Sequence, residues 1–137
     1  MLTSTKDEKG SVAVEFAILL PLFIMFVWGA IEFGLAYYTQ EVLTNATREG
    51  ARAGIVQTLP KPTVAQIQAI VTSYVTNSGV PIGSLNAPTV TGAGGVFPNP
   101  LTVTATYNYT FPIVSMITAG AVPASITLTA STVMRHE

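Results

Sequence analysis

Little of this chain has the residue types that catalysis or metal binding requires. It contains no cysteine, which excludes disulfides, CxxC redox chemistry and thiolate metal sites. Its one histidine, His136, cannot by itself form a metal cluster or a catalytic triad. Six Lys and Arg residues and a formal net charge of −1 offer no basic face for nucleic acid. We therefore expect no enzymatic activity, no cofactor and no nucleic-acid partner.

The residue with the clearest chemical consequence is Glu15. It is the only charged residue among the 20 from Val12 to Ile31. A charged side chain at the centre of a membrane helix costs ~2.5 to 3.5 kcal/mol on insertion scales, and less near an interface. The carboxylate therefore either lies at the headgroup level, snorkelling or protonated, or is neutralised by a cation. From the carboxylate alone both interpretations stay open.

The segment around Glu15 predicts a membrane-spanning helix at about residues 12–31. About 20 mostly apolar residues cross a bilayer core at about 1.5 Å per residue. The mean hydropathy of +0.50 and the 9% of charged residues agree with a membrane protein. Pro21 predicts a helix kink because it removes one helical hydrogen bond, although membrane helices tolerate proline. At the far end we expect one acidic and several aromatic residues to lie at the membrane interface: Trp28, Glu32, Phe33, Tyr37 and Tyr38.

The ten residues MLTSTKDEKG form a polar leader directly before the apolar run. A secretory signal peptide would have its small-residue cleavage site after the run, and none follows Ile31 in a polar stretch, so we expect the span to be retained. The junction instead resembles the class-III signal of type IV prepilins. That resemblance implies a prepilin peptidase cut between Gly10 and Ser11. It also implies that Glu15, the fifth residue after the cut and followed by Phe16, neutralises a neighbouring subunit's amino group during assembly.

The residues beyond the span identify a branch of that family. GSVAVEFAILLPLF, IEFG and LTNATREGARAG resemble the N-terminal signature of TadE-like proteins, minor pilins of the tight-adherence (Tad) branch of type IV pili. The resemblance extends from Gly10 to about Gly54, and the REGAR stretch makes it specific. Glu49 and Arg52 stand three apart, which permits a helix-surface pair of about 0.2 to 0.5 kcal/mol. Whether Arg48, Glu49 and Arg52 form a subunit contact or a solvated polar face stays open.

Two helices are expected before any strand. The helical pattern of the span continues without a break, so one long helix is predicted from Ser11 to about Val56, with its outer half amphipathic. The Leu59 to Pro62 stretch ends it, because proline cannot continue the helical hydrogen-bond ladder. TVAQIQAIVTSYVTNSG then predicts a second helix with one apolar face: Val64, Ile67, Val71, Tyr74 and Val75.

The C-terminal part predicts a small antiparallel sheet. Residues 80–100 are rich in Gly, Pro, Ser and Asn, so loops are expected around one short strand near residues 89–91. LTVTATYNYTF and ASITLTASTVMRHE alternate apolar and polar residues, and we expect them to pair antiparallel with one face on the helices. The apolar connector, residues 113–119, is either a short helical turn or a surface dipping toward the membrane. The closing strand also resembles the end of TadE-like domains.

The predicted fold class is α+β and pilin-like: a long N-terminal membrane-spanning helix, a second helix and a small antiparallel sheet. The predicted domains are a leader (1–10), a long helix (11–57) and a small periplasmic or extracellular α+β domain (58–137). The resemblance implies a structural subunit that is incorporated into a Tad pilus for adhesion, or initiates one. It is expected first as a single-pass inner-membrane protein with its N-terminus inside, and then at the cell surface.

The implied partners are a prepilin peptidase, the major pilin, other minor pilins, the inner-membrane assembly platform and the lipid bilayer. Two alternatives stay open. One is a pseudopilin of a type II protein secretion system, in which the same helix would form a periplasmic piston. The other is a small ligand-binding or enzymatic domain on an uncleaved signal anchor.

Overall fold

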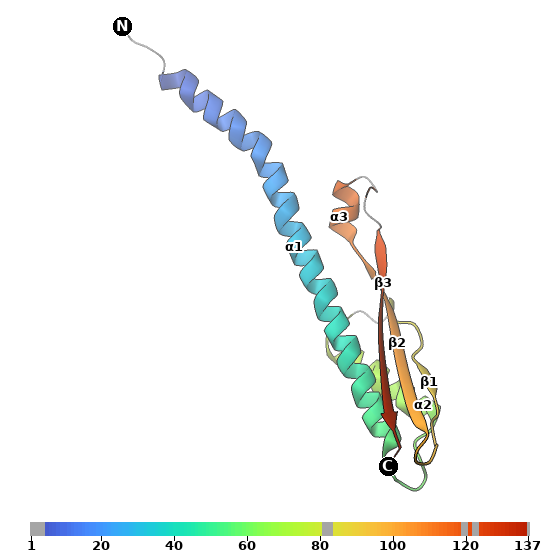
Figure 1. Cartoon of the computed structure of the whole chain (residues 1–137). Helices are drawn as coiled ribbons and strands as arrows, with labels where there is room; N and C mark the ends of the chain where they lie inside the picture. Colours follow the sequence, from blue (N-terminus) through green and yellow to red (C-terminus); the bar gives the residue numbers. More distant parts are fainter. Residues whose placement is uncertain (1–4, 81–83, 119–120, 122–123, 137) are drawn as a thin grey trace. The chain divides into compact units, whose positions relative to one another are not determined.

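The computed structural model describes residues 5–80, 84–118, 121 and 124–136, with the backbone alone at residues 5–9 and 114. The first four residues of the predicted leader, residues 81–83 of the predicted loop and Ala119 of the predicted connector lie outside the described residues. The elements in chain order (Figure 1) are α1 (Thr5–Ile55), α2 (Val64–Asn77), β1 (Thr89–Thr91), β2 (Pro100–Thr110), α3 (Pro112–Ile117) and β3 (Ser125–Arg135).

This arrangement confirms the predicted α+β class, with a long apolar N-terminal helix, a second helix and a small antiparallel sheet. The chain divides into two compact units, which we describe separately. Unit 1 contains Met1–Gly34 and Phe111–Ala124, and unit 2 contains Leu35–Thr110 and Ser125–Glu137. Helix α1 contributes to both units.

Helix α1 has 51 residues and includes Pro21 without a break in the helical assignment. It ends at Ile55, within one residue of the predicted Val56. Its start differs from the prediction, because it begins at Thr5 and not at Ser11. Residues 5–9 contain two lysines and one glutamate, which are good helix formers, and no helix breaker separates them from the span. The helix therefore runs through the predicted Gly10–Ser11 junction.

Unit 2 is built around one apolar core that α1, α2 and the sheet share. The C-terminal half of α1 has one buried face, and the buried residues of α2 lie at the three-to-four spacing of a helix. The inward side chains of β2 alternate with outward threonines, as the period-two pattern predicted. The largest fully buried apolar side chains are Leu43, Ile67, Val71, Val75, Leu101 and Val103.

The sheet has the order β1-β2-β3, and both pairings are antiparallel. The β2–β3 ladder runs from Pro100 opposite Arg135 to Thr110 opposite Ser125, which confirms the predicted pairing. Strand β1 has the bounds that the sequence predicted. Phe111, predicted as the last strand residue, instead follows β2, because Pro112 begins α3 and offers no N–H to a strand partner.

Helix α2 begins with a capping box at Thr63. The backbone N–H of Gln66 donates to Thr63 Oγ1 at 3.3 Å, and the backbone N–H of Thr63 donates to Gln66 Oε1 at 2.9 Å. The predicted apolar face is confirmed at its centre but is narrower than expected. Val64 and Tyr74 remain 41% and 37% exposed, because they lie at the edges of the stripe that faces the core.

The end of the chain closes the loop between β1 and β2. His136 is buried, and its Nε2 donates to the carbonyl oxygen of Gly92 at 2.8 Å. Lys61 Nζ donates to the carbonyl oxygen of Gly95 at 2.5 Å. Gly92 has φ of 85°, a left-handed conformation that glycine adopts without strain. The single histidine is thus a structural residue in the part of the chain that is described.

The REGARAG stretch contains two glycines that the packing requires. A Cβ atom on Gly50 would lie 2.6 Å from Val71 Cγ2, and one on Gly54 would overlap Leu101 Cδ2 and lie 2.7 Å from Ile67 Cδ1. Real Cβ atoms do not approach carbon this closely, so α2 and β2 would have to move. The small residues of α1 therefore set how closely α2 and the sheet approach it.

We expect Gly50→Ala and Gly54→Ala each to destabilise unit 2 by about 1 to 3 kcal/mol, the usual cost of overpacking a core. The measurement is the urea midpoint of unfolding of the full chain in detergent, monitored by circular dichroism. Gly34→Ala is the matched control, because nothing lies within 4 Å of a Cβ there. A Gly54→Ala protein as stable as the Gly34→Ala protein would contradict the packing argument.

Candidate functional site

Between Val12 and Ile31, apolar side chains lie on all sides of α1. Between Val12 and Ile31 its large apolar residues are exposed, reaching 71% at Ile18 and 76% at Phe26. Monomeric soluble proteins rarely expose a continuous apolar surface of this extent. Within the described residues, α1 is the one helix long and apolar enough to cross a membrane. It is therefore a candidate membrane anchor.

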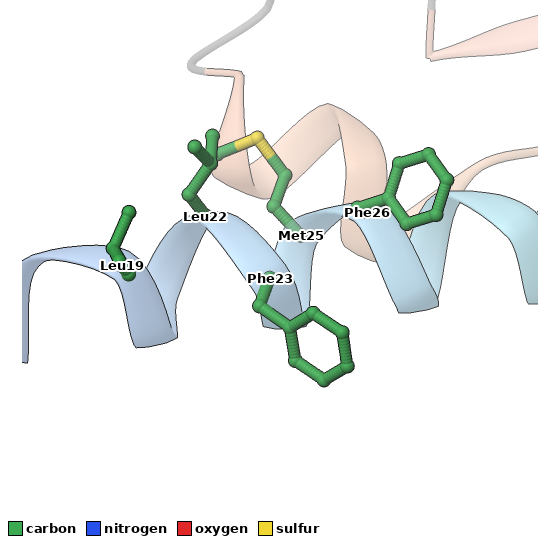
Figure 2. Close-up of a pocket in the computed structure, with 5 residues that line it drawn as sticks. All are labelled: Leu19, Leu22, Phe23, Met25 and Phe26. Carbon is green, nitrogen blue, oxygen red and sulfur yellow. The ribbon is translucent and has the colours of Figure 1, made fainter. Parts of the chain in front are cut away.

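The exposed surface of α1 includes an open apolar hollow of about 630 Å³. Figure 2 shows Leu22 and Met25 rising from one side of the helix and Phe23 pointing from the other. No titratable or nucleophilic group lines it, so it offers packing and no chemistry. Its size and apolar lining suit a lipid chain or the side chains of a neighbouring helix. The lining residues are Leu19, Leu22, Phe23, Met25 and Phe26.

The predicted junction and assembly residues lie at the N-terminal end of this surface. Gly10, Ser11, Glu15 and Phe16 are all exposed, and no side chain lies within 4 Å of a Cβ built on Gly10. The junction is accessible from outside the chain. Nothing in unit 1 tests the roles assigned to these four residues or to Pro21, which remain predictions.

Glu32 lies at the C-terminal end of the apolar run and is buried, with 3% of its surface exposed. Its Oε1 accepts a hydrogen bond from the backbone N–H of Ile113 at 2.8 Å. Beside it, the rings of Phe33 and Phe111 pack with centroids 5.5 Å apart. The sequence indicated an interfacial Glu32 but not this partner, which is 81 residues away in the chain. The alternative of a helical turn in the connector is confirmed by α3.

The charged residues of the REGARAG stretch lie on a different face of α1 from Gly50 and Gly54. Arg52 Nη2 lies 2.9 Å from Glu49 Oε1, and Arg52 Nε donates to Glu49 Oε2 at 3.2 Å. The pair is open to solvent, with the two side chains 72% and 42% exposed. The hydrogen bond from Arg52 lowers the pKa of Glu49, and the carboxylate raises the pKa of Arg52. Arg48 is exposed.

The charged residues and the glycines of this stretch have different structural roles. Glu49 and Arg52 pair with each other, which confirms the spacing argument, while the adjacent Gly50 and Gly54 are the residues that pack. No subunit contact of Arg48, Glu49 or Arg52 is tested. Within the described chain, no group of three or more His, Cys, Asp or Glu side chains is placed to hold a metal ion.

Comparison with known proteins gives one result. Residues 10–52 match the model of a family described as TadE-like protein. The matched region contains the junction, Glu15, the span, Glu32 and the REGAR stretch. No curated protein and no solved structure matches the chain.

We expect Glu49→Gln to leave the unfolding midpoint unchanged near pH 7, because exposed pairs contribute little. The pKa of Glu49 is lowered in the folded chain, so any stabilisation by the pair is present at neutral pH. It is lost as the pH falls through the lowered pKa.

The measurement is the urea midpoint of the full chain between about pH 7 and pH 3, a range that includes the usual carboxylate pKa. Glu41→Gln is the matched control, because Glu41 is another exposed glutamate of α1. A large loss for Glu49→Gln at neutral pH would contradict a solvated pair.

Proposed function

We propose that this chain, which is TadE-like over residues 10–52, is a pilin-like structural subunit of the Tad pilus system. The family match supports its coarse character as a Tad-associated pilin-like protein. Processing by a prepilin peptidase and incorporation into a pilus are the finer parts of the proposal. The observation that supports them is that the surface of α1 differs between unit 1 and unit 2.

In unit 1 the helix is apolar and exposed around its circumference, whereas in unit 2 its outer half forms one wall of a packed core. A helix that is apolar all round must be covered by lipid or by other helices. A membrane subunit that later packs its helix among identical or related helices meets both conditions. The domain of residues 58–137 is then carried outside the membrane, with the leader of residues 1–10 inside.

Cleavage at the proposed junction requires a peptidase to reach the peptide bond between Gly10 and Ser11. The junction lies in a continuous helix, yet both residues are exposed. Glycine in a helix interior costs about 1 kcal/mol relative to alanine, so the helix is intrinsically weak at Gly10. Local unwinding there would present the bond to a prepilin peptidase at the cytoplasmic side.

Cleavage would create a new positive charge on Ser11, close to an exposed carboxylate. The proposed role of Glu15 is to neutralise this amino group on a neighbouring subunit during assembly. In an apolar filament core an unpaired charge is costly, so only a register that pairs the two groups is favourable. The proposed partners are the major pilin, other minor pilins and the inner-membrane assembly platform.

We expect the protein extracted from its native cells to lack the ten leader residues and to begin at Ser11. Replacing Gly10 by a bulky residue such as Leu should leave the leader in place, because the peptidase would no longer accept the junction. Intact-mass spectrometry measures both outcomes. Gly34→Leu is a control for the added side chain. A native N-terminus at Met1 would overturn the proposal. So would loss of the leader from the Gly10→Leu protein to the same extent as from the native protein.

We expect Glu15→Ala to be cleaved normally but to be incorporated poorly, because the amino group on the neighbouring subunit loses its carboxylate. The measurement is the amount of the subunit in sheared pili relative to that in the membrane. Glu41→Ala controls for loss of an acidic residue elsewhere on α1. Normal incorporation of the Glu15→Ala subunit would count against the assigned pairing.

A further inference from the structure

The connection between β2 and β3 is unusually apolar for a loop of the outward domain. Residues 111–124, FPIVSMITAGAVPA, contain no charged residue. They belong to unit 1, together with the N-terminal part of α1, and not to the unit that holds the sheet. The described part of this segment, residues 111–118, 121 and 124, is called here the α3 loop. Its composition raises the question of what covers it.

Two contacts hold the α3 loop at the outer end of the span. The ring of Phe111 packs on Phe33, and the backbone N–H of Ile113 donates to Glu32, one residue beyond Ile31. As the chain advances from residue 111 to 113, its contacts on α1 move from residue 33 to 32, toward the span. Figure 1 shows α3 continuing beside α1 in that direction.

Several backbone groups of the α3 loop are hydrogen-bonded within the chain. Pro112 opens α3 and has no N–H, while the N–H of Ile113 is bound by Glu32. The N–H of Ser115 donates to Phe111 O at 3.2 Å. The base of the loop is closed by Phe111 N–H, which donates to Ala124 O at 2.8 Å. Lipid requires such internal satisfaction of backbone groups, because it supplies no hydrogen-bonding partner.

The outer side of α3 presents apolar surface. Met116 is 75% exposed and Pro112 is also exposed, while Ile113 and Ile117 are half-buried. A helix of six residues is about 9 Å long, so α3 is far too short to span a bilayer core and could enter only its boundary. Lipid is favoured over a protein partner because the segment has no charged residue and contacts α1 at Glu32 and Phe33, directly after the apolar span.

We propose that the α3 loop is a second membrane element, which inserts α3 into the outer boundary of the bilayer beside the span. This inference rests on the proposed function, because it requires α1 to cross a bilayer. Glu32 is a positioning residue: its carboxylate holds the start of α3 at the level where the span leaves the hydrocarbon. The subunit would then meet the membrane through two elements, and both would have to leave the lipid for assembly.

The test uses the full chain in vesicles of phosphatidylcholine and phosphatidylglycerol. Because the chain has no cysteine, Met116→Cys gives one site for an environment-sensitive fluorophore, and the single Trp28 reports on the span. Val133→Cys is the matched control, since Val133 is an exposed apolar residue of β3 in unit 2. Lipids brominated near the carbonyl end of the acyl chain quench probes at the boundary, and iodide quenches probes in water.

We expect bromolipid to quench the probe at position 116 about as strongly as Trp28, and iodide to quench the probe at position 133. If Trp28 is quenched by bromolipid but the probe at position 116 is quenched only by iodide, the inference is overturned while the membrane anchor stands. If the probe at position 116 is protected from both quenchers, protein covers the loop and the inference is also wrong. If Trp28 itself escapes bromolipid, the membrane anchor fails as well.

A second variant tests the positioning role. In the Met116→Cys background, Glu32→Ala should lower bromolipid quenching of the probe and raise iodide quenching, with Trp28 unchanged. Glu32→Gln keeps an acceptor oxygen for Ile113 N–H and should preserve the parent values. Equal quenching of the probe in the Glu32→Ala and parent proteins would show that Glu32 does not position α3.

Discussion

The apolar circumference of α1 in unit 1 is the constraint on which the rest of the molecule depends. A helix that has no polar face cannot rest on the surface of a soluble domain, so lipid or other helices must cover it. The outer half of the same helix has one apolar face and supplies a wall of the unit 2 core. One continuous helix therefore meets two environments.

The REGARAG stretch illustrates how one short motif can satisfy two requirements. Gly50 and Gly54 are small because α2 and β2 approach α1 closely, whereas Glu49 and Arg52 pair on a solvated face. A motif read as charged in the sequence thus owes part of its identity to packing. Glu32 likewise has two roles. It ends the apolar run of α1, and its carboxylate accepts a hydrogen bond from the N–H of Ile113, the first N–H of α3.

Much of the fold could be predicted because it depends on local patterns. The alternation in β2, the short β1 and the breaks at Pro60 and Pro62 each follow from a few neighbouring residues. The errors lie at element ends. Phe111 fits the alternation but lies outside β2, because Pro112 starts a helix. Helix α1 begins at Thr5, because nothing in the leader breaks a helix. The assembly residues were placed by resemblance to a family whose model matches residues 10–52, and their roles stay predictions.

The sequence by itself determined the long apolar helix and the order of helices and strands, because hydrophobic pattern and proline act over a few residues. The candidate junction came from the family resemblance and stays a prediction. Only the tertiary structure decided that Glu32 binds the start of α3, that His136 closes the loop at Gly92 and that the α3 loop belongs to the unit of the span. The partners in the two hydrogen bonds lie 81 and 44 residues apart. Hydrogen-bond geometry across such separations exists only after the chain has folded.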